Sequence, residues 1–388
     1  MSHTSRTYPH IQFKKTWKLT ETALYHFGQC DATIKAISNT PIRPDYRADL
    51  HSIALIKGAQ ATTAIEGNTL TYEQIREIQK GKKISPSKEY LQIEVQNIIT
   101  ALNGILHELL VQKKIETINP ELIRSFHKMV GKDLGDHFKA IPGRFRNNNV
   151  TVGNYLAPDY TDVQNLINQL CAWLKEEFHY ESDQSFTEAI LQAIVTHIYI
   201  AWIHPFSDGN GRTARLLEYY LLLRAGVPDI ASHVLSNHYN FTRSEYYRQI
   251  ENATLKKDLT EFIDYAVQGF RDGLYETLAI IQENQLQITW RNYIYGIFDN
   301  KKATGKATIA IKRRRNLILR IPSDKNINET EISELHPSII REYSGLSERT
   351  LSRDLEELII MDLVDKNKDG YRAKVEILKK YMALRLNQ

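Results

Sequence analysis

The sequence predicts a mainly α-helical protein with one short β-hairpin in its central part, and three observations support this prediction. Residues 186–203 are apolar almost all round, as expected for a helix buried in a protein core. Residues 95–109 carry apolar side chains at helical spacing, which predicts an amphipathic helix. Residues 150–153 alternate valine with threonine and end in glycine, a pattern typical of a short exposed hairpin.

The composition indicates a globular protein of two or three domains. Its 388 residues are 42% hydrophobic, which is enough for a substantial core. The two cysteines, Cys30 and Cys171, have neither metal-binding nor disulfide spacing, so we expect a reducing, cytoplasmic location. We recognise no signal peptide and no run of about twenty apolar residues, and we expect no membrane partner. A net charge of +4 is too small to imply nucleic-acid binding by itself.

The segment from His204 to Arg215, HPFSDGNGRTAR, places a base beside an anion site. Pro205 disfavours helical geometry at the residue before it, so we expect the buried helix to end there. Gly209 and Gly211 permit backbone conformations in which successive N–H groups point into one concavity that binds phosphate. The next helix follows directly, and its N-terminus favours negative charge. An ordinary turn explains any one of these residues but not the whole set.

Charged side chains complete this segment. Arg212 and Arg215 lie three residues apart, on nearly one face of a helix, and can reach different phosphates of a polyphosphate. Asp208 would repel a phosphate unless a hard cation such as Mg²⁺ bridges the two. The unperturbed pKa of histidine, about 6.5, suits His204 as a base at neutral pH. Attack of a hydroxyl on phosphorus needs these residue types.

The same segment resembles the signature of the Fic family, HxFx(D/E)GNGRxxR, at every specified position. The resemblance implies a Fic helical bundle and an enzyme that uses ATP and Mg²⁺ to transfer AMP to a Ser, Thr or Tyr hydroxyl of a target protein. It makes His204 the catalytic base, Asp208 the metal ligand and Phe206 the anchor of the loop. It assigns ATP contacts to six residues: Asp208, Gly209, Asn210, Gly211, Arg212 and Arg215.

Far upstream, residues 62–68, TTAIEGN, resemble the inhibitory motif (S/T)xxxE(G/N) of many Fic proteins. The resemblance implies that Glu66 forms a salt bridge with Arg215 and takes that arginine away from the γ-phosphate. The position of the motif before the core marks an N-terminally autoinhibited subclass. In some relatives this glutamate also positions a water for removal of AMP, so the reverse reaction stays open. The alternative is a plain helix C-terminus closed by Gly67.

Two further stretches resemble parts of the family's substrate site. Val150, Thr151, Val152 and Gly153 resemble the flap, which implies that a target peptide binds there by strand addition and that the flap covers the nucleotide. A plain surface hairpin is the alternative. Residues 243–254, RSEYYRQIENAT, resemble the helix that lines the adenine pocket. Tyr246 and Thr254 are therefore candidates for ATP binding, with core packing as the alternative.

The C-terminal segment predicts a helix at 337–343, a turn, a second helix to Met361 and a hairpin with Asp-Gly at its tip. This order resembles a winged-helix domain, with Arg349 and Arg353 on the recognition helix. Residues 301–388 hold 19 Lys and Arg against 13 Asp and Glu. That excess permits DNA contact, but acidic residues such as Asp354 on the same helix would oppose it, which favours a docking or dimerisation module over DNA binding.

Four regions are therefore expected. Residues 1–112 form a helical region with the inhibitory helix, residues 113–285 the catalytic core, residues 286–305 a linker and residues 306–388 a winged-helix domain. Two functions remain in competition, namely a protein adenylyltransferase and a DNA-binding regulator whose core senses nucleotide. Possible partners beyond the target protein are a second copy of the chain and DNA. The intact His204 favours the enzyme, because a pure sensor needs no base.

Overall fold

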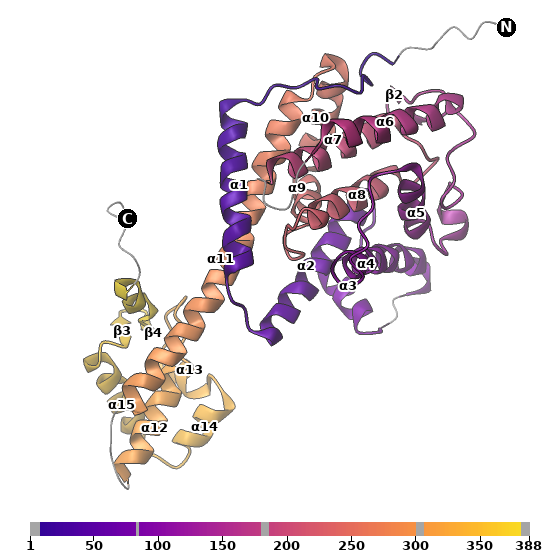
Figure 1. The fold of residues 1–388 in the computed structure, drawn as a ribbon. Helices are drawn as coiled ribbons and strands as arrows, with labels where there is room; N and C mark the ends of the chain where they lie inside the picture. Colours follow the sequence, from indigo (N-terminus) through magenta and orange to yellow (C-terminus); the bar gives the residue numbers. More distant parts are fainter. Residues whose placement is uncertain (1–7, 83–84, 180–185, 300–305, 382–388) are drawn as a thin grey trace, which may run out of the picture. The chain divides into compact units, whose positions relative to one another are not determined.

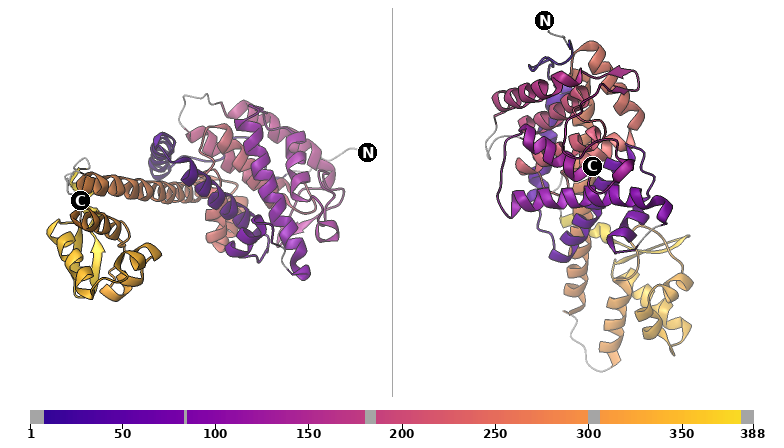
Figure 2. Two further views of the ribbon diagram at one scale, coloured as in Figure 1. Left: turned by 90° about the horizontal axis from the view of Figure 1, so that it is seen from below. Right: turned by 90° about the vertical axis from the view of Figure 1, so that its right-hand side faces the viewer.

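The computed structural model describes residues 8–82, 85–179, 186–299 and 306–381. The chain divides into two compact units, Met1–Ala279 and Ile280–Gln388, which we describe separately. Figures 1 and 2 trace the chain through both units. No helix among the described residues combines the length and the apolar character that crossing a membrane requires.

The first unit consists of helices and one small antiparallel hairpin. Its α-helices are α1 Glu21–Asn39, α2 Pro44–Ala64, α3 Tyr72–Gln79, α4 Glu89–Leu110, α5 Pro120–Val130, α6 Val163–Glu177, α7 Thr187–Ile203, α8 Asn210–Arg224, α9 Val234–Phe241, α10 Arg243–Lys256 and the first part of α11 Thr260–Asp299. Short 3-10 helices span Pro86–Lys88, Gly135–His137 and Tyr160–Asp162, and the hairpin strands are β1 Thr151–Val152 and β2 Tyr155–Leu156. The predicted mainly helical fold with a small hairpin is confirmed.

Helices α7 and α8 form the centre of the first unit. Almost every side chain of α7 is buried, as its all-round apolar sequence predicts, and most of α8 is buried too. Figure 1 shows α8 beside α7, with α4 and α5 packed against it from another side. Helix α2 also contacts α8, so α8 is enclosed by the helices that carry the candidate site residues.

Helix α2 ends in a turn that presents Glu66. The backbone N–H of Asn68 donates to the carbonyl of Thr63 at 3.2 Å, and the N–H of Gly67 donates to that of Ala64 at 3.0 Å. Gly67 has φ +100°, the left-handed conformation that this closure needs. The alternative interpretation of the sequence, a helix C-terminus closed by Gly67, is therefore correct as local structure. It also holds Glu66 in a defined turn.

The second unit contains the predicted helix, turn, helix and hairpin. Its elements after the end of α11 are α12 Lys306–Ile318, α13 Glu329–Glu334, α14 Pro337–Tyr343, α15 Glu348–Ile360, β3 Val364–Asn367, β4 Gly370–Ala373 and a 3-10 helix at Val375–Tyr381. Ile327 pairs with Tyr371 through two backbone hydrogen bonds of 3.0 and 2.8 Å, which adds a bridge to the edge of the hairpin.

The predicted linker at 286–305 differs from the structure, because α11 continues to Asp299. Trp290, Ile294 and Phe298 recur every four residues and are buried in the core of the second unit. One helical face therefore buries these side chains, which favours a helix over an open linker. Residues 300–305 lie outside the described residues.

Asp354 in α15 is buried and does not share the surface with Arg349 and Arg353, which are exposed. Its carboxylate pairs with Arg313 Nε at 2.6 Å and with Arg314 Nε at 2.8 Å. The expectation that Asp354 would oppose a DNA backbone is therefore wrong, because the side chain faces inward. Arg313 and Arg314 are equally committed to pairing inside the unit.

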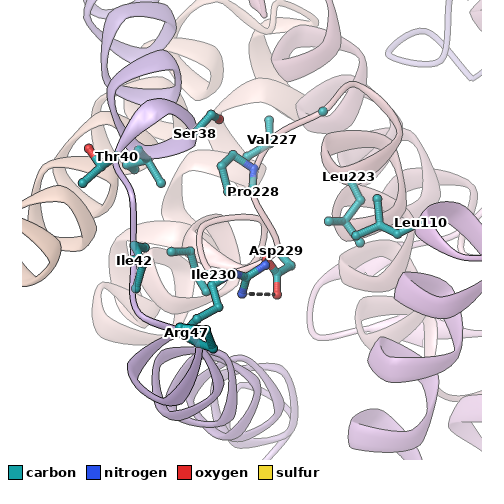
Figure 3. Close-up of a pocket in the computed structure, with 13 residues that line it drawn as sticks. Ser38, Thr40, Ile42, Arg47, Leu110, Leu223, Val227, Pro228, Asp229 and Ile230 are labelled. Atoms are coloured by element: carbon teal, nitrogen blue, oxygen red, sulfur yellow. Dashed lines mark hydrogen bonds and ion pairs between the residues drawn. The ribbon is translucent and has the colours of Figure 1, made fainter.

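A cavity of about 600 Å³ lies between the start of α2 and the segment after α8 (Figure 3). Asp229 at its edge is bound by Arg47 Nη2 at 2.8 Å and by His51 Nδ1 at 2.7 Å. Burial alone would raise the pKa of Asp229, but hydrogen bonds from His51 and Arg47 outweigh it and lower the pKa to about 2. The hydrogen bond to Asp229 in turn raises the pKa of His51. This cluster attaches the first turns of α2 to the chain segment after α8.

Replacing Asp229 with Asn should lower the free energy of unfolding by about 2 kcal/mol, because it leaves Arg47 and His51 without a buried counterion. The Asp229 contribution is present above its unfolded pKa and is lost as the pH falls toward 2. The His51 contribution is present below its unfolded pKa and is lost as the pH rises through its raised folded pKa. Urea unfolding at about pH 5.5 and about pH 8.5 should show the larger loss at the lower pH. An equal loss at both would contradict the assigned role of His51.

Candidate functional site

His204 stands at the junction between α7 and the following loop. Its backbone has φ +49°, in the left-handed region, and its N–H still donates to Ile200 O at 2.9 Å. Pro205 disfavours the right-handed helical conformation at this residue, and the helix ends there as predicted. Burial lowers the pKa of His204 to about 4. The imidazole is therefore neutral at physiological pH and able to accept a proton.

Asn210 closes the loop between His204 and α8. Its side-chain oxygen accepts from the backbone N–H of Phe206 at 2.9 Å, and its side-chain nitrogen donates to Phe206 O at 2.8 Å. Asn210 is buried, and both polar atoms of its side chain are used by the loop. The residue therefore shapes the loop in this conformation, and its predicted contact with the α-phosphate stays a prediction.

His127 holds the loop from the side, a role that the sequence analysis missed. Its ring stacks on the buried Phe206 ring with centroids 3.6 Å apart. Nδ1 accepts from the backbone N–H of Gly143 at 2.9 Å, so the proton is on Nε2, which donates to Asp208 O at 2.9 Å. Burial lowers the pKa of His127 to about 4, which keeps this neutral form. Phe206 is thereby an anchor in the core, as predicted.

Both glycines of the loop lie where a side chain would collide. Gly209 has φ +78°, and a Cβ there would lie 2.8 Å from Phe138 Cζ. A Cβ on Gly211 would lie 2.3 Å from Glu66 Oε1 and 3.0 Å from Arg215 Nη1. The backbone N–H groups of the first helical turn have no carbonyl partner within α8. The Glu66 carboxylate therefore lies directly against the helix N-terminus at which the sequence predicts an anion.

Glu66 and Arg215 form the predicted ion pair. Arg215 Nη2 lies 2.6 Å from Glu66 Oε1 and also donates to Thr62 O at 2.8 Å. Arg215 is 2% exposed, and within the described part of the chain its Nε and Nη1 have no hydrogen-bond partner. Burial alone would raise the pKa of Glu66, but Arg215 and Arg212 outweigh it and lower the pKa. Glu66 is thus a carboxylate ion in this conformation.

Arg212 is held between two carboxylates. Its Nη1 pairs with Glu94 of α4, and its Nη2 lies 2.7 Å from Asp208 Oδ1. Its guanidinium also lies over the ring of Phe138, 5.5 Å from the ring centroid. Glu94 was not predicted, although its position between Leu91 and the apolar stripe of residues 95–109 was a signal that its side chain is buried.

The hairpin formed by β1 and β2 is connected to His204 through Arg146. β1 and β2 pair with Thr151 opposite Leu156 and Val152 opposite Tyr155, which confirms the predicted hairpin. Arg146 is buried and donates to His204 O at 2.8 Å. It also donates to carbonyls on both sides of the hairpin, those of Asn148 and Pro158.

The two adenine-pocket candidates on α10 have partners inside the protein. Tyr246 is buried, and its hydroxyl lies 2.8 Å from His197 Nε2. Thr254 Oγ1 accepts from Trp202 Nε1 at 2.8 Å. Their contact with a nucleotide stays a prediction. The neighbouring Tyr247, which was not predicted, donates its hydroxyl to the carbonyl of Ile65 at 3.2 Å and so supports the turn before Glu66.

The donor set fits a magnesium ion that arrives with a polyphosphate. Among the described residues, no group of three or more His, Cys, Asp or Glu side chains is arranged to hold a metal. Asp208 supplies one carboxylate at the loop, with 27% of its side chain exposed. Mg²⁺ is commonly held by one or two carboxylates together with substrate phosphates and water. Asp208 suits that arrangement.

Residues 117–222 match the model of the Fic/DOC family. The chain is 32% identical over 212 residues to "Protein adenylyltransferase fic-1" of Caenorhabditis elegans, covering 53% of this chain and 38% of that protein. It is 32% identical over 208 residues to "Protein adenylyltransferase Fic" of Nematostella vectensis, covering 53% and 45% respectively. The chain therefore spans less than half the length of these two relatives.

Two solved structures resemble the fold. A Fic family protein from Desulfovibrio desulfuricans G20 aligns with a TM-score of 0.57 and 18% identity, covering 96% of this chain and 100% of that one. Fic-1 from C. elegans aligns with a TM-score of 0.54 and 24% identity, covering 68% of this chain and 73% of that one. At these identities the likeness shows a shared fold.

Replacing Gly211 with Ala should weaken the pair between Glu66 and Arg215. The new Cβ would collide with Glu66 Oε1 and lie 3.0 Å from Arg215 Nη1, so both side-chain ends must shift and the buried arginine is less well matched by its counterion. We expect the melting temperature to fall by about 4 °C or more in a thermal unfolding measurement.

Gly104→Ala is the matched control, because a Cβ at that position of α4 meets nothing within 4 Å. Alanine there should raise stability by about 0.5–1 kcal/mol through helix propensity. A Gly211→Ala protein as stable as the wild type, with Glu66 still on Arg215 in its crystal structure, would contradict the steric argument.

Proposed function

From the Fic domain that residues 117–222 form, we propose that this chain transfers AMP from ATP to a hydroxyl group of a protein and that Glu66 restrains the reaction. The observation that supports this proposal most strongly is the position of the Glu66 carboxylate, which pairs with Arg215 and lies next to Gly211 at the start of α8. A carboxylate occupies the place where backbone N–H groups and arginines favour an anion. A triphosphate needs the same groups, so the two compete. The names of the C. elegans and N. vectensis relatives agree with this activity.

The ATP phosphates would lie at the N-terminus of α8. The backbone N–H groups of Gly209 and Gly211 would donate to the α-phosphate, and Arg212 and Arg215 would bind the β- and γ-phosphates. Asp208 would hold magnesium together with the phosphates, and the ion would neutralise phosphate charge there.

His204 would act as the general base. Its neutral imidazole would take the proton from a Ser, Thr or Tyr hydroxyl while the hydroxyl oxygen forms a bond to the α-phosphorus. The bond from that phosphorus to the bridging oxygen breaks, and pyrophosphate leaves with the electron pair. The flap would hold the target hydroxyl in line with the bond to the leaving group. A second proposed activity is removal of AMP by hydrolysis, in which a water positioned by Glu66 would attack the α-phosphorus, the bond from phosphorus to the target's oxygen would break, and the target hydroxyl and AMP would be released.

The target protein would bind at the hairpin formed by β1 and β2. Thr151 and Val152 are exposed, and a two-residue strand leaves backbone donors and acceptors for an incoming peptide. Pairing along that edge would set the register of the target, and Arg146 connects the hairpin to the His204 carbonyl. Recognition of the target would then take place next to the base.

The second unit would act as a winged-helix module that positions targets or partners. The bridge between Ile327 and Tyr371 and the hairpin after α15 support that assignment. Since Arg313 and Arg314 pair with Asp354, fewer basic groups remain for a nucleic-acid backbone. A cytoplasmic location agrees with the free, buried cysteines Cys30 and Cys171.

Replacing Glu66 with Gly should activate the enzyme. Incubation with α-labelled ATP, Mg²⁺ and a cell lysate should give at least about tenfold more protein labelling than the wild type, because Arg215 becomes available to the nucleotide. The double variant Glu66→Gly/His204→Ala should give none. Glu121→Gln, which alters a carboxylate with 72% side-chain exposure paired to Arg124, is the matched control and should label like the wild type. If neither Glu66→Gly nor the double variant labels any protein, the proposed function is overturned.

The pH dependence of the Glu66→Gly enzyme should reflect the lowered pKa of His204. With that pKa at about 4, the base stays neutral well below the ordinary histidine range. Single-turnover AMP transfer should hold its rate from about pH 8 to about pH 5.5 and decline below about pH 5. Circular dichroism at each pH separates this decline from unfolding. A half-maximal loss near pH 6.5 would mean that the His204 pKa is not depressed.

A further inference from the structure

The buried carboxylate of Glu94 contacts the site from α4, outside both motifs. We propose that Glu94 is a positioning residue that holds the guanidinium of Arg212 in the orientation that a polyphosphate needs. Asn68, in the inhibitory turn, holds the carboxylate of Glu94 in place. This inference rests on the proposed function, because it takes the start of α8 as the phosphate site.

Arg212 has little freedom in this arrangement. It is 6% exposed, pairs with Glu94 through Nη1 and with Asp208 through Nη2, and lies over the ring of Phe138. Two carboxylates, one on each terminal nitrogen of a planar guanidinium, define its orientation better than either alone. The direction of the remaining N–H groups is therefore set by Glu94 and Asp208 together.

Of these two partners, Glu94 is the one that stays when a nucleotide binds. Asp208 lies in the loop, is 27% exposed at its side chain, and is the carboxylate assigned to the metal. Glu94 is 8% exposed and belongs to the 22-residue helix α4, so its Cα is held by a rigid element. Once Asp208 turns to another ligand, Glu94 is what keeps Arg212 in place.

Asn68 connects Glu94 to the turn that carries Glu66. Its side-chain nitrogen donates to Glu94 Oε2 at 2.7 Å and to Leu91 O at 3.0 Å, while its oxygen accepts from Leu70 N at 3.0 Å. All of these groups are buried or nearly so, and such hydrogen bonds are costly to break. The inhibitory turn thus reaches both arginines: Glu66 binds Arg215, and Asn68 secures the partner of Arg212.

If Glu94 contributed only its negative charge, removing it would change polyphosphate binding in the opposite direction from the loss of a positioning residue. Three carboxylates, those of Glu66, Glu94 and Asp208, surround two arginines. Removing one negative charge from such a site should strengthen the binding of a polyphosphate if nothing moved. Loss of position should weaken it. The sign of the change therefore separates the two roles.

The test is calorimetric titration of ATP and of AMP, each with Mg²⁺, into Glu66→Gly as reference and into Glu66→Gly combined with Glu94→Gln or Glu94→Asp. Glu94→Asp keeps the charge but withdraws the carboxylate by one methylene. If Glu94 positions Arg212, both substitutions should raise the Kd of ATP about tenfold. Both should leave the Kd of AMP within about twofold, because AMP lacks the phosphates that Arg212 would bind. Adding Asn68→Ala to the reference should change ATP binding in the same direction by a smaller factor.

Asn97→Ala in the same background is the matched control. Asn97 lies one turn after Glu94 on α4, is buried, and donates to Val130 O at 3.2 Å and Lys132 O at 2.6 Å. It should lower stability without changing the ratio of ATP to AMP affinity. Tighter or unchanged ATP binding by the Glu94 variants, or an equal loss for ATP and AMP, would overturn the positioning role. A Glu66→Gly reference that binds no ATP would instead remove the proposed function.

Discussion

The structure depends most on the positive potential at the start of α8. Backbone N–H groups without helical partners, Arg212 and Arg215 are brought together there, and Glu66 supplies the compensating negative charge. Arg215 is almost fully buried, so leaving it without an anion would cost several kcal/mol. The site therefore needs an anion at all times. In the proposed function, inhibition by Glu66 and binding of the ATP phosphates would be two ways to satisfy this one electrostatic requirement.

The elements around this charge differ in how freely they can move. Helices α7 and α8 are buried along most of their length, and the loop between them is closed by Asn210 and the His127 ring. Helix α2 is attached at its start by Asp229 and ends in the turn with Glu66. Hydrogen bonds from Tyr247 and Asn68 support that turn. Exchange of Glu66 for phosphate thus requires a change in the turn and its few hydrogen bonds, while the base and the loop stay in place.

The sequence predicted what depends on local pattern. The buried helix before His204, the hairpin at residues 150–153 and the helix–turn–helix with its hairpin follow from spacing and turn residues, and all are present. Glu94, His127 and Arg146 could not be found in the same way. Each is an isolated polar residue whose contact with the segment 204–215 spans 58 or more positions of the chain, as with Arg146 and His204. Asp354 was misplaced because a charged residue on an amphipathic helix is usually exposed, and only its two arginine partners explain its burial.

The central claim is that Glu66 occupies the place of a phosphate, and a crystal structure of the Glu66→Gly protein with a non-hydrolysable ATP analogue and Mg²⁺ tests it most directly. We expect phosphate oxygens within hydrogen-bond distance of the Gly211 backbone N–H and of Arg215, with His204 facing the α-phosphorus. A nucleotide bound elsewhere, or none, with Arg215 finding a new counterion within the protein, would contradict the account.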